Sequence, residues 1–152
     1  MEKLYELHDL NFAYKQQGQI FPALKNINLT IEPAEFLCLC GPSGSGKSTL
    51  LNLLGLIEPP QEGSLFFRES DLCHLGERQK NNLRRFDLGF IFQQFHLLPT
   101  LSASENVGYF LKHQKLSAKD SLERIHHALN LVGLYDYKDK RPNQLSGGQR
   151  QR

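Results

Sequence analysis

Polar and apolar residues alternate with a period of two in the N-terminal part of the chain. The segments 3–14, KLYELHDLNFAY, and 26–31, NINLTI, both show this alternation. Because successive side chains of a strand point to opposite faces, the pattern is typical of antiparallel strands with one covered face. The sequence therefore predicts an antiparallel β layer in this part of the molecule.

Two later segments are apolar at nearly every position. They are residues 35–41, EFLCLCG, and residues 88–92, LGFIF. Continuous apolar runs of this length are typical of parallel strands that are buried on both faces. A further short strand is predicted at residues 63–67, GSLFF.

Helical patterns fill the stretches between and after these strands. Residues 47–57 are expected to form a helix that packs on the strand before it and ends near Pro59 and Pro60, and a second helix is expected at residues 77–85. Antiparallel strands at the N-terminus, followed by buried strands with helices between them, predict an α/β fold with an appended β layer.

Two more helices carry clear start signals. Ser102 and Glu105 have the spacing of a capping box for a helix through about residue 111. Ser117 opens another helix, which Gly133 closes. Its apolar stripe has helical spacing and indicates a core-facing side; it consists of Leu122, Ile125, Leu129 and Val132.

Composition changes this picture little. The 152 residues suit one ordinary domain, and a net charge of +2 with 22% charged residues does not indicate a nucleic-acid partner. No apolar run approaches the roughly 20 residues of a membrane helix, and the first residues do not resemble a signal peptide. Cys38, Cys40 and Cys73 form no metal-binding spacing, so we expect reduced cysteines that act as small hydrophobic side chains.

The segment Gly41–Thr49, GPSGSGKST, carries the strongest chemical signal. Gly41, Gly46, Lys47 and Ser48 fill each fixed place of the phosphate-loop pattern G-x-x-x-x-G-K-[ST] between an expected strand and helix. Glycines let backbone N–H groups point inward, and the helix presents its positive end. We expect Lys47 to bridge the β and γ phosphates of a nucleotide, and Ser48 to offer its hydroxyl to Mg²⁺. The remaining candidates in this loop are Pro42, Ser43, Gly44, Ser45 and Thr49.

A phosphate loop alone does not separate ATPases, GTPases and kinases, but two later motifs do. The segment FIFQQF places Gln93 just after an expected buried strand, and LSGGQRQR occupies residues 145–152. SGGQ by itself is a weak signal, because Ser-Gly-Gly is also typical of flexible loops. Together and in this order, the three motifs form a specific combination.

With these motifs the sequence resembles the nucleotide-binding subunit of ABC transporters, over essentially the whole chain. The match includes ALKNINLTI, the phosphate loop, Gln93 and the signature LSGGQ at residues 145–149. The motif sequences are most similar to those of the branch that contains lipoprotein-releasing, macrolide-export and cell-division ATPases. Polar amino acid importers carry similar sequences. The resemblance implies a P-loop NTPase fold with a core and β layer in about residues 1–92. It places the glutamine loop, the helical region and the signature in about residues 93–152.

The resemblance also implies the roles of individual residues, with ATP and Mg²⁺ as cofactors. Lys47 and Gln93 would serve catalysis, with Gln93 reaching Mg²⁺ and the attacking water. Tyr14 would stack on adenine, although a tyrosine that merely ends an edge strand is the alternative. The signature residues would face the ATP of a second subunit in a head-to-tail dimer; they are Ser146, Gly147, Gly148 and Gln149. Integral membrane permease subunits would be the partners, and the protein would lie in the cytoplasm at the inner face of the membrane.

The chain departs from the family pattern in two places. Ala34 in EPAEF stands where the family usually has glycine, so we expect a turn of different form. The family's apolar strand ending in Asp-Glu and its switch histidine follow the signature, and this sequence stops before them. We therefore expect these 152 residues to bind ATP but not to hydrolyse it, and we interpret Asp136 in NLVGLYD as a solvated loop residue.

Two alternative functions stay open at this point. A non-catalytic ABC module could complete the ATP site of a partner while its own site cannot hydrolyse ATP. Another P-loop GTPase or kinase is disfavoured by the presence of LSGGQ and by the lack of an N-K-x-D motif.

Overall fold

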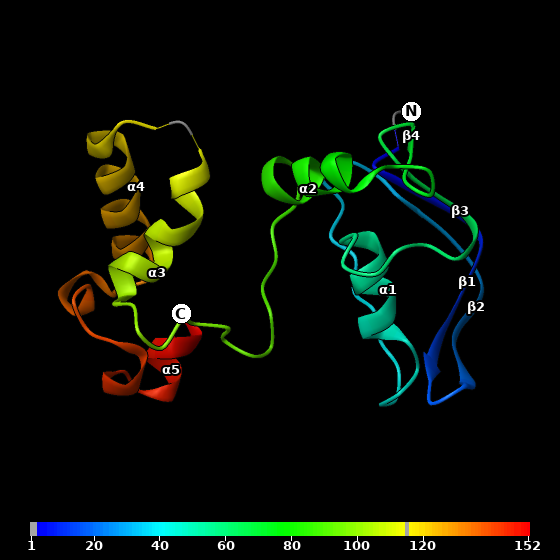
Figure 1. Ribbon diagram of the computed structural model, residues 1–152, viewed down its shortest axis with the longest axis horizontal. Coiled ribbons are helices and arrows are strands. Elements are labelled where there is room, and N and C mark those ends of the chain that lie inside the picture. Colours follow the sequence, from blue (N-terminus) through cyan, green and yellow to red (C-terminus); the bar gives the residue numbers. More distant parts are fainter. Residues whose placement is uncertain (1–2, 115) are drawn as a thin grey trace. The chain divides into compact units, whose positions relative to one another are not determined.

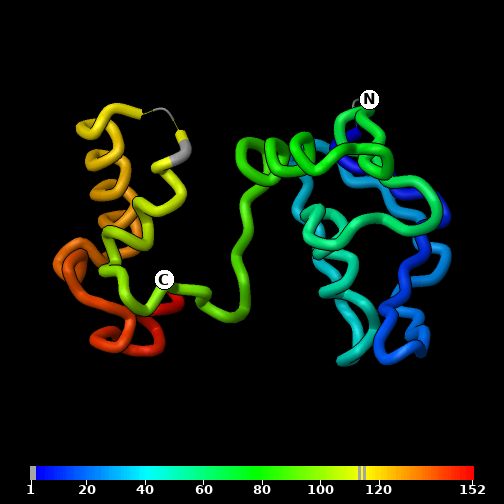
Figure 2. Tube along the Cα trace, in the orientation of Figure 1, coloured from blue at the N-terminus to red at the C-terminus, as the bar shows by residue number. Residues whose placement is uncertain are grey.

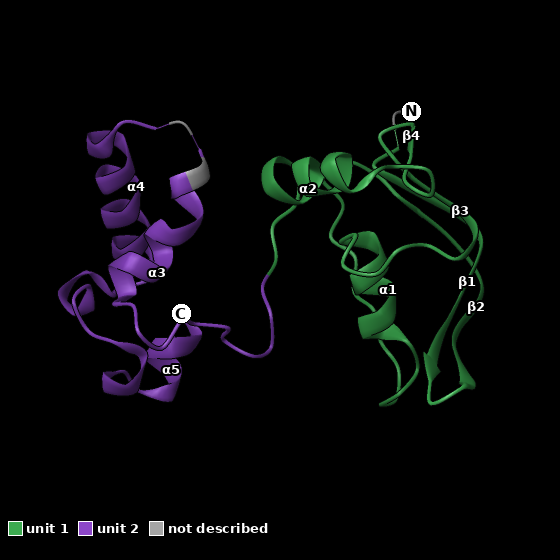
Figure 3. Ribbon diagram, in the orientation of Figure 1, with its two compact units in different colours: residues 1–90 green, residues 91–152 purple. Residues whose placement is uncertain are grey.

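The computed structural model describes residues 3–114 and 116–152, with only the backbone at position 113. These residues form two compact units, residues 1–90 and residues 91–152, which Figure 3 shows in different colours. The first unit contains a β-sheet with two helices, and the second unit is helical.

The sheet of the first unit has the order β2-β1-β3-β4 and is antiparallel throughout. Its strands are β1 (Tyr5–Gln16), β2 (Gln19–Ile31), β3 (Glu62–Phe67) and β4 (Ser70–Asp71). The antiparallel layer was predicted from alternation, and a short strand was predicted at residues 63–67. The two-residue strand β4 is too short to leave such a pattern.

A β-bulge in β1 explains why its buried positions change parity. Tyr5 and Leu7 are buried, but the next buried residue is Leu10. On β2, Leu7 pairs with Leu29 and Leu10 pairs with Ile27, so β1 carries one extra residue between the two pairs. Asp9 is this extra residue. Its φ is 47°, and its backbone N–H donates to Oδ1 of Asn28 at 3.0 Å. The bulge thus turns the charged Asp9 away and keeps Leu10 in the core.

Helix α1 (Lys47–Leu54) packs on this sheet and completes the core (Figure 1). Leu53 of α1 is fully buried together with Leu7, Leu10 and Leu65 of the sheet. Burying a leucine side chain contributes about 1.5–3 kcal/mol, so this packing stabilises the position of α1 on the sheet.

The expected strands at 35–41 and 88–92 are absent, and this prediction was wrong. Residues 32–46 run from β2 to α1 without regular secondary structure. Figure 2 traces the path of the chain through this connection. Phe36 is 94% exposed and Ile91 is 101% exposed. Cys38 and Cys40 are exposed too, so they are not buried hydrophobes, whereas Cys73 is half-buried. A strand needs hydrogen-bonding partners, and among the described residues no strand pairs with either segment.

The turn after β2 keeps a left-handed residue despite the absence of glycine. Glu35 N–H donates to the carbonyl of Glu32 at 3.3 Å, and Ala34 has a φ of 62°. Ala34 thus adopts the positive φ that residues with a Cβ disfavour. A left-handed conformation costs a residue with a Cβ about 1–2 kcal/mol, so this turn is strained.

Replacing Ala34 with glycine is expected to raise the free energy of unfolding by about 1 kcal/mol or slightly less, because relief of strain exceeds the entropic cost of glycine. Urea denaturation measures the change. In Ala128→Gly, within a helix of the second unit, the same substitution should instead lower the stability by about 1 kcal/mol. A change in the free energy of unfolding that has the same sign in both variants would contradict the strain at residue 34.

The helices largely follow their predicted ranges. Helix α2 (Glu77–Phe86) belongs to the first unit, and the second unit contains α3 (Ala103–Tyr109), α4 (Ala118–Leu131) and α5 (Gly147–Gln151). Single 3₁₀ turns occupy Phe110–His113, Tyr135–Tyr137 and Pro142–Gln144. Helices α3 and α4 lie side by side (Figure 1). No helix in the described part of the chain is long and apolar enough to cross a membrane.

Start signals of the second unit are confirmed in detail. The Ser102 hydroxyl accepts from Glu105 N–H at 3.3 Å, and the Ser117 hydroxyl accepts from Asp120 N–H at 3.1 Å. The apolar stripe of α4 is covered only in part, because Leu129 is buried whereas Leu122 is 53% exposed. Asp136 is exposed, as expected.

Candidate functional site

The loop 41–46 leads directly into helix α1, which begins at Lys47. Gly46 is the N-cap with φ 89° and ψ 0°, and a Cβ there would lie 2.5 Å from the carbonyl oxygen of Ala23. Gly44 has a similar φ of 80°, but a Cβ there would meet no atom within 4 Å. The loop approaches β2 closely at residue 46, and this explains why the motif requires a glycine there.

The Lys47 ammonium group folds back over this loop. It donates to the carbonyl oxygens of Gly41 at 2.9 Å and Pro42 at 2.7 Å, and it lies 3.3 Å from Oγ of Ser45. Among the described residues no carboxylate forms an ion pair with it. The positive charge and the N-terminal N–H groups of α1 thus meet in one exposed loop, which suits an anion.

The other residues of the loop fit the same use. Pro42, Ser43, Gly44, Ser45 and Ser48 are all exposed. The Ser48 hydroxyl is accessible at the first turn of α1, where a hydrated cation beside a bound phosphate could reach it. No group of three or more His, Cys, Asp or Glu side chains in the described part of the chain is placed to hold a metal ion by itself.

Tyr14 lies next to this helix start. Its hydroxyl is 3.3 Å from Oγ1 of Thr49, which is only 7% exposed. Its ring makes an edge contact with Phe12 at a centroid distance of 5.0 Å and remains 39% exposed. The exposed ring could stack on a planar group beside the loop. Thr49 is therefore turned inward, toward β1, rather than outward with Ser48.

Long-range contacts also hold the far end of α1. The Tyr5 hydroxyl donates to the carbonyl of Leu54 at 2.9 Å, and burial raises the pKa of Tyr5 to about 12. The Arg84 guanidinium of α2 donates to the carbonyl of Leu56. Free carbonyls at a helix C-terminus favour such donors. No local sequence pattern indicates these contacts, because their partners are far apart in the chain.

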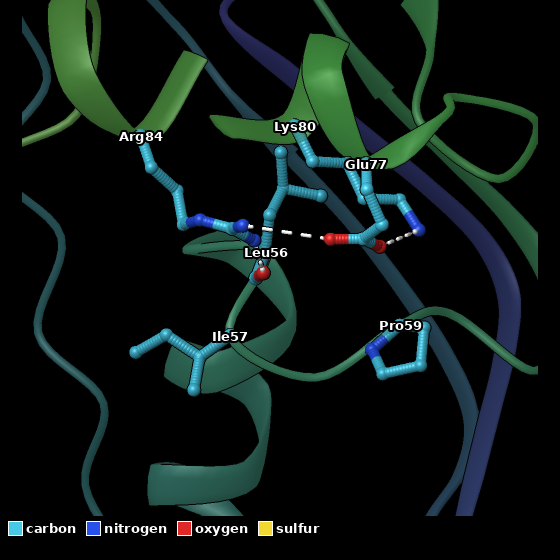
Figure 4. A pocket seen from close by; sticks show the side chains of 6 residues that line it. All are labelled: Leu56, Ile57, Pro59, Glu77, Lys80 and Arg84. Atoms are coloured by element: carbon cyan, nitrogen blue, oxygen red, sulfur yellow. Dashed lines mark hydrogen bonds and ion pairs between the residues drawn. The ribbon is translucent and has the colours of Figure 1, made fainter. Parts of the chain in front are cut away.

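A shallow pocket of about 330 Å³ lies beside this end of α1 (Figure 4). Glu77 lies between two basic side chains there, 3.5 Å from Lys80 Nζ and 3.7 Å from the Arg84 guanidinium. Leu56, Ile57 and Pro59 complete the lining. Because its charges are paired internally, we assign this pocket to the packing of α2 against the segment that follows α1.

Gln93 and the signature belong to the second unit. Gln93 is exposed in a bend. The Asn106 side chain, which the sequence did not single out, fixes the end of the segment that follows Gln93. It accepts from Leu98 N–H at 2.8 Å, and it donates to the carbonyls of Leu101 at 3.1 Å and Ser102 at 2.9 Å.

The signature forms the start of α5. Ser146 is its N-cap: its hydroxyl accepts from Gln149 N–H at 3.2 Å, and its N–H donates to Oε1 of Gln149 at 2.8 Å. Gly147 and Gly148 are exposed, with open space where a Cβ would stand. The Gln149 side chain therefore closes the capping box in this structure. The guanidinium of Arg150 lies 5.7 Å from the ring of Phe95, which links α5 to the segment after Gln93.

Within the first unit the structure thus brings together Tyr14, Lys47, Ser48 and Thr49 at one helix start. Within the second unit it places Phe95 beside Arg150, the residue that follows the signature.

Comparisons with known proteins cover nearly the whole chain. Residues 24–152 match a family model described as ABC transporter. The uncharacterized ABC transporter ATP-binding protein YvrO of Bacillus subtilis (strain 168) is 40% identical over 96% of this chain and 64% of YvrO. The macrolide export ATP-binding/permease protein MacB of Syntrophobacter fumaroxidans is 40% identical over 98% of this chain and 21% of that protein.

A solved structure agrees with this match. The dimeric post-hydrolysis state of the ATP-binding cassette MJ0796 bound to ADP and Pi has a TM-score of 0.87 at 38% identity. It covers 96% of this chain and 65% of the MJ0796 chain, and the MJ0796 sequence comes from Methanocaldococcus jannaschii. The present chain spans less than two thirds of YvrO and of MJ0796.

Proposed function

Because this chain belongs to the ABC transporter family, we propose that it is the ATP-binding part of an ABC transporter, in which ATP binding and hydrolysis drive a membrane partner. One observation carries this proposal. The exposed loop 41–46 ends at the N-terminus of α1, and the Lys47 ammonium has only uncharged oxygen partners there among the described residues. The α/β fold agrees with that of the ATP-binding cassette MJ0796.

Lys47 would exchange its contacts when ATP binds. It would leave the carbonyls of Gly41 and Pro42 and bind the β and γ phosphates. At about 4 Å, an ammonium and a phosphate charge attract each other by roughly 4 kcal/mol at an effective dielectric constant of 20, before desolvation. Backbone N–H groups of residues 41–49 would hold the remaining phosphate oxygens, and Tyr14 would cover adenine.

Mg²⁺ would neutralise charge on the phosphates, and Ser48 fits a role in holding it because its hydroxyl is exposed at the loop. Gln93 would orient the attacking water and contact the cation. An amide is a poor base, so Gln93 positions the water and does not take its proton.

We further propose that two copies pair head to tail, each supplying its signature to the other's ATP. The dimer of MJ0796 supports pairing, and the fused ATP-binding/permease protein MacB supports a permease partner. The protein would then act at the inner face of the membrane.

Calorimetric titration with MgATP tests the proposed function directly. We expect saturable binding of one ATP per chain, and competition by tripolyphosphate, because most contacts are to phosphate. Absence of binding at millimolar MgATP would remove the proposal.

The variant Ser146→Arg tests the trans role of the signature. We expect ATP binding to the variant's own loop to stay within about twofold, because the loop 41–49 does not include residue 146, while ATP-dependent pairing is lost. Sedimentation in ATP measures pairing with a complete ATP-binding subunit of the same transporter. Lys119→Arg, at an 84% exposed side chain, is the matched control. Undiminished pairing by Ser146→Arg would show that the signature does not act on a second copy.

A further inference from the structure

Strand β1 extends beyond the end of its neighbour β3. The pairing of the two strands ends where Asn11 lies opposite Glu62, whereas β1 continues to Gln16. Two residues farther along the same register, Ala13 would lie opposite Pro60. A proline has no backbone N–H, so it cannot donate to the carbonyl of Ala13. The backbone ladder between β1 and β3 therefore cannot continue to this position.

The side chain of Gln61 takes the place of the missing backbone partner. Its Oε1 accepts from the Ala13 N–H at 3.0 Å, and its Nε2 donates to the Ala13 carbonyl oxygen at 3.0 Å. The amide of a glutamine side chain offers a donor and an acceptor, as a peptide group does. Gln61 comes directly before Glu62, the first residue of β3. Its side chain thus extends the ladder by one more pair of hydrogen bonds.

The residue that follows Ala13 is Tyr14, whose ring lies beside the start of α1. Its hydroxyl is 3.3 Å from Oγ1 of Thr49, and its ring makes an edge contact with Phe12. Residues 14–16 pair with residues 19–21 of β2 and form the tip of the hairpin. The hydrogen bonds of Gln61 and the hydroxyl of Tyr14 connect this tip to the segment before β3 and to α1.

We infer that Gln61 is a positioning residue for the nucleotide base: it holds the end of β1 so that the Tyr14 ring is in place to stack on adenine. This inference rests on the proposed function. A side chain that has to be ordered during binding lowers the affinity, and one that is held beforehand does not. Because the stacking involves the base and not the phosphates, the effect of Gln61 is confined to ligands that carry a base.

The variant Gln61→Ala removes both hydrogen bonds and leaves the phosphate loop unaltered. We expect its affinity for MgATP to fall about threefold to tenfold, because the Tyr14 ring then has to be ordered during binding. Its affinity for tripolyphosphate, which has no base, should stay unchanged; calorimetric titration measures both. Gln19→Ala, at an exposed glutamine of the same hairpin, is the matched control and should bind both ligands as the unaltered protein does. Equal losses for the two ligands would overturn the inference, because they would show a general disturbance of the site.

A second background tests whether Gln61 acts through Tyr14. In the variant Tyr14→Ala the ring is absent, so adding Gln61→Ala should cause no further loss of MgATP affinity. A further loss of the same size as in the unaltered background would show that Gln61 acts by another route, and the inference would be wrong.

Nuclear magnetic resonance measures the positioning in the absence of nucleotide. In Gln61→Ala we expect the Ala13 amide proton to exchange with solvent several-fold faster. The nuclear Overhauser contact between the Tyr14 ring and the Thr49 methyl group should weaken. Amide protons of the buried core should keep their exchange rates, which shows that the variant is folded. An Ala13 amide and a Tyr14 ring that behave as in Gln19→Ala would contradict the positioning role.

The titrations also separate this inference from the proposed function. If the unaltered protein binds neither MgATP nor tripolyphosphate, the proposed function fails and the inference fails with it. If the unaltered protein binds both ligands and Gln61→Ala binds MgATP equally well, the inference alone fails.

Discussion

Replacing Lys47 with alanine is expected to weaken MgATP binding by roughly 10- to 100-fold, because charge-assisted hydrogen bonds contribute about 1.5–3 kcal/mol each. Among the residues that the structure describes, this ammonium is bound only by neutral oxygens of residues 41, 42 and 45, so it can be transferred to phosphate. Alanine leaves the backbone N–H groups of the loop in place, and residual binding through these groups should persist.

Isothermal titration calorimetry with MgATP and with tripolyphosphate measures this loss. Both ligands should lose affinity by a similar factor, since the lysine acts on phosphate and not on the base. Lys119→Ala removes the same charge at an 84% exposed site in the other unit and should bind as the unaltered protein does. Far-UV circular dichroism checks that both variants are folded. Equal affinities of Lys47→Ala and the control would exclude the loop 41–49 as the phosphate site.

Replacing Gly63 with alanine is expected to lower the free energy of unfolding by about 2–5 kcal/mol. Gly63 has a φ of 87°, and an added Cβ would lie 2.5 Å from the carbonyl oxygen of Asp9 and 2.6 Å from that of His8. These two atoms belong to the bulge in β1, and backbone cannot move away as a flexible side chain can. The substitution should therefore force β3 away from the bulge.

Gly18→Ala is the matched control, since Gly18 has a φ of 81° and no atom within 4 Å of an added Cβ. In Gly18→Ala only backbone strain opposes the substitution, so the free energy of unfolding should fall by about 1–2 kcal/mol. Urea denaturation of both variants gives the difference. Equal losses would mean that backbone strain dominates and that contact with the bulge contributes nothing.

The sequence predicted those elements whose cause is local. Alternation revealed β1 and the second half of β2, and side-chain spacing revealed the capping box at Ser102, because both signals lie within a few residues. The apolar segments 35–41 and 88–92 were misassigned for a physical reason. Hydrophobicity reports a preference for burial, whereas a strand also needs another strand to receive its hydrogen bonds.

In the candidate site, too, the sequence predicted the local features and not the contacts between distant residues. The phosphate loop and the signature are readable because glycine, lysine and serine are required at fixed spacing. The contact of Tyr14 with Thr49 joins residues 35 positions apart, and that of Arg84 with Leu56 joins residues 28 apart. Neither pair leaves a periodic pattern. The bulge at Asp9 also has no sequence signal beyond the change of parity from Leu7 to Leu10.

The buried core of the first unit has a consequence for the order of events during synthesis. Among the described residues of this unit, the buried hydrophobic side chains come from residues 5–72, and they include those of α1. Chains are synthesised at about 5–20 residues per second, and N-terminal domains fold first. The ribosome therefore still has to add the second unit when the nascent chain already contains the complete core behind the phosphate loop. We expect this loop to reach its final form several seconds before the signature leaves the exit tunnel, so a growing chain could meet nucleotide before it can meet a partner.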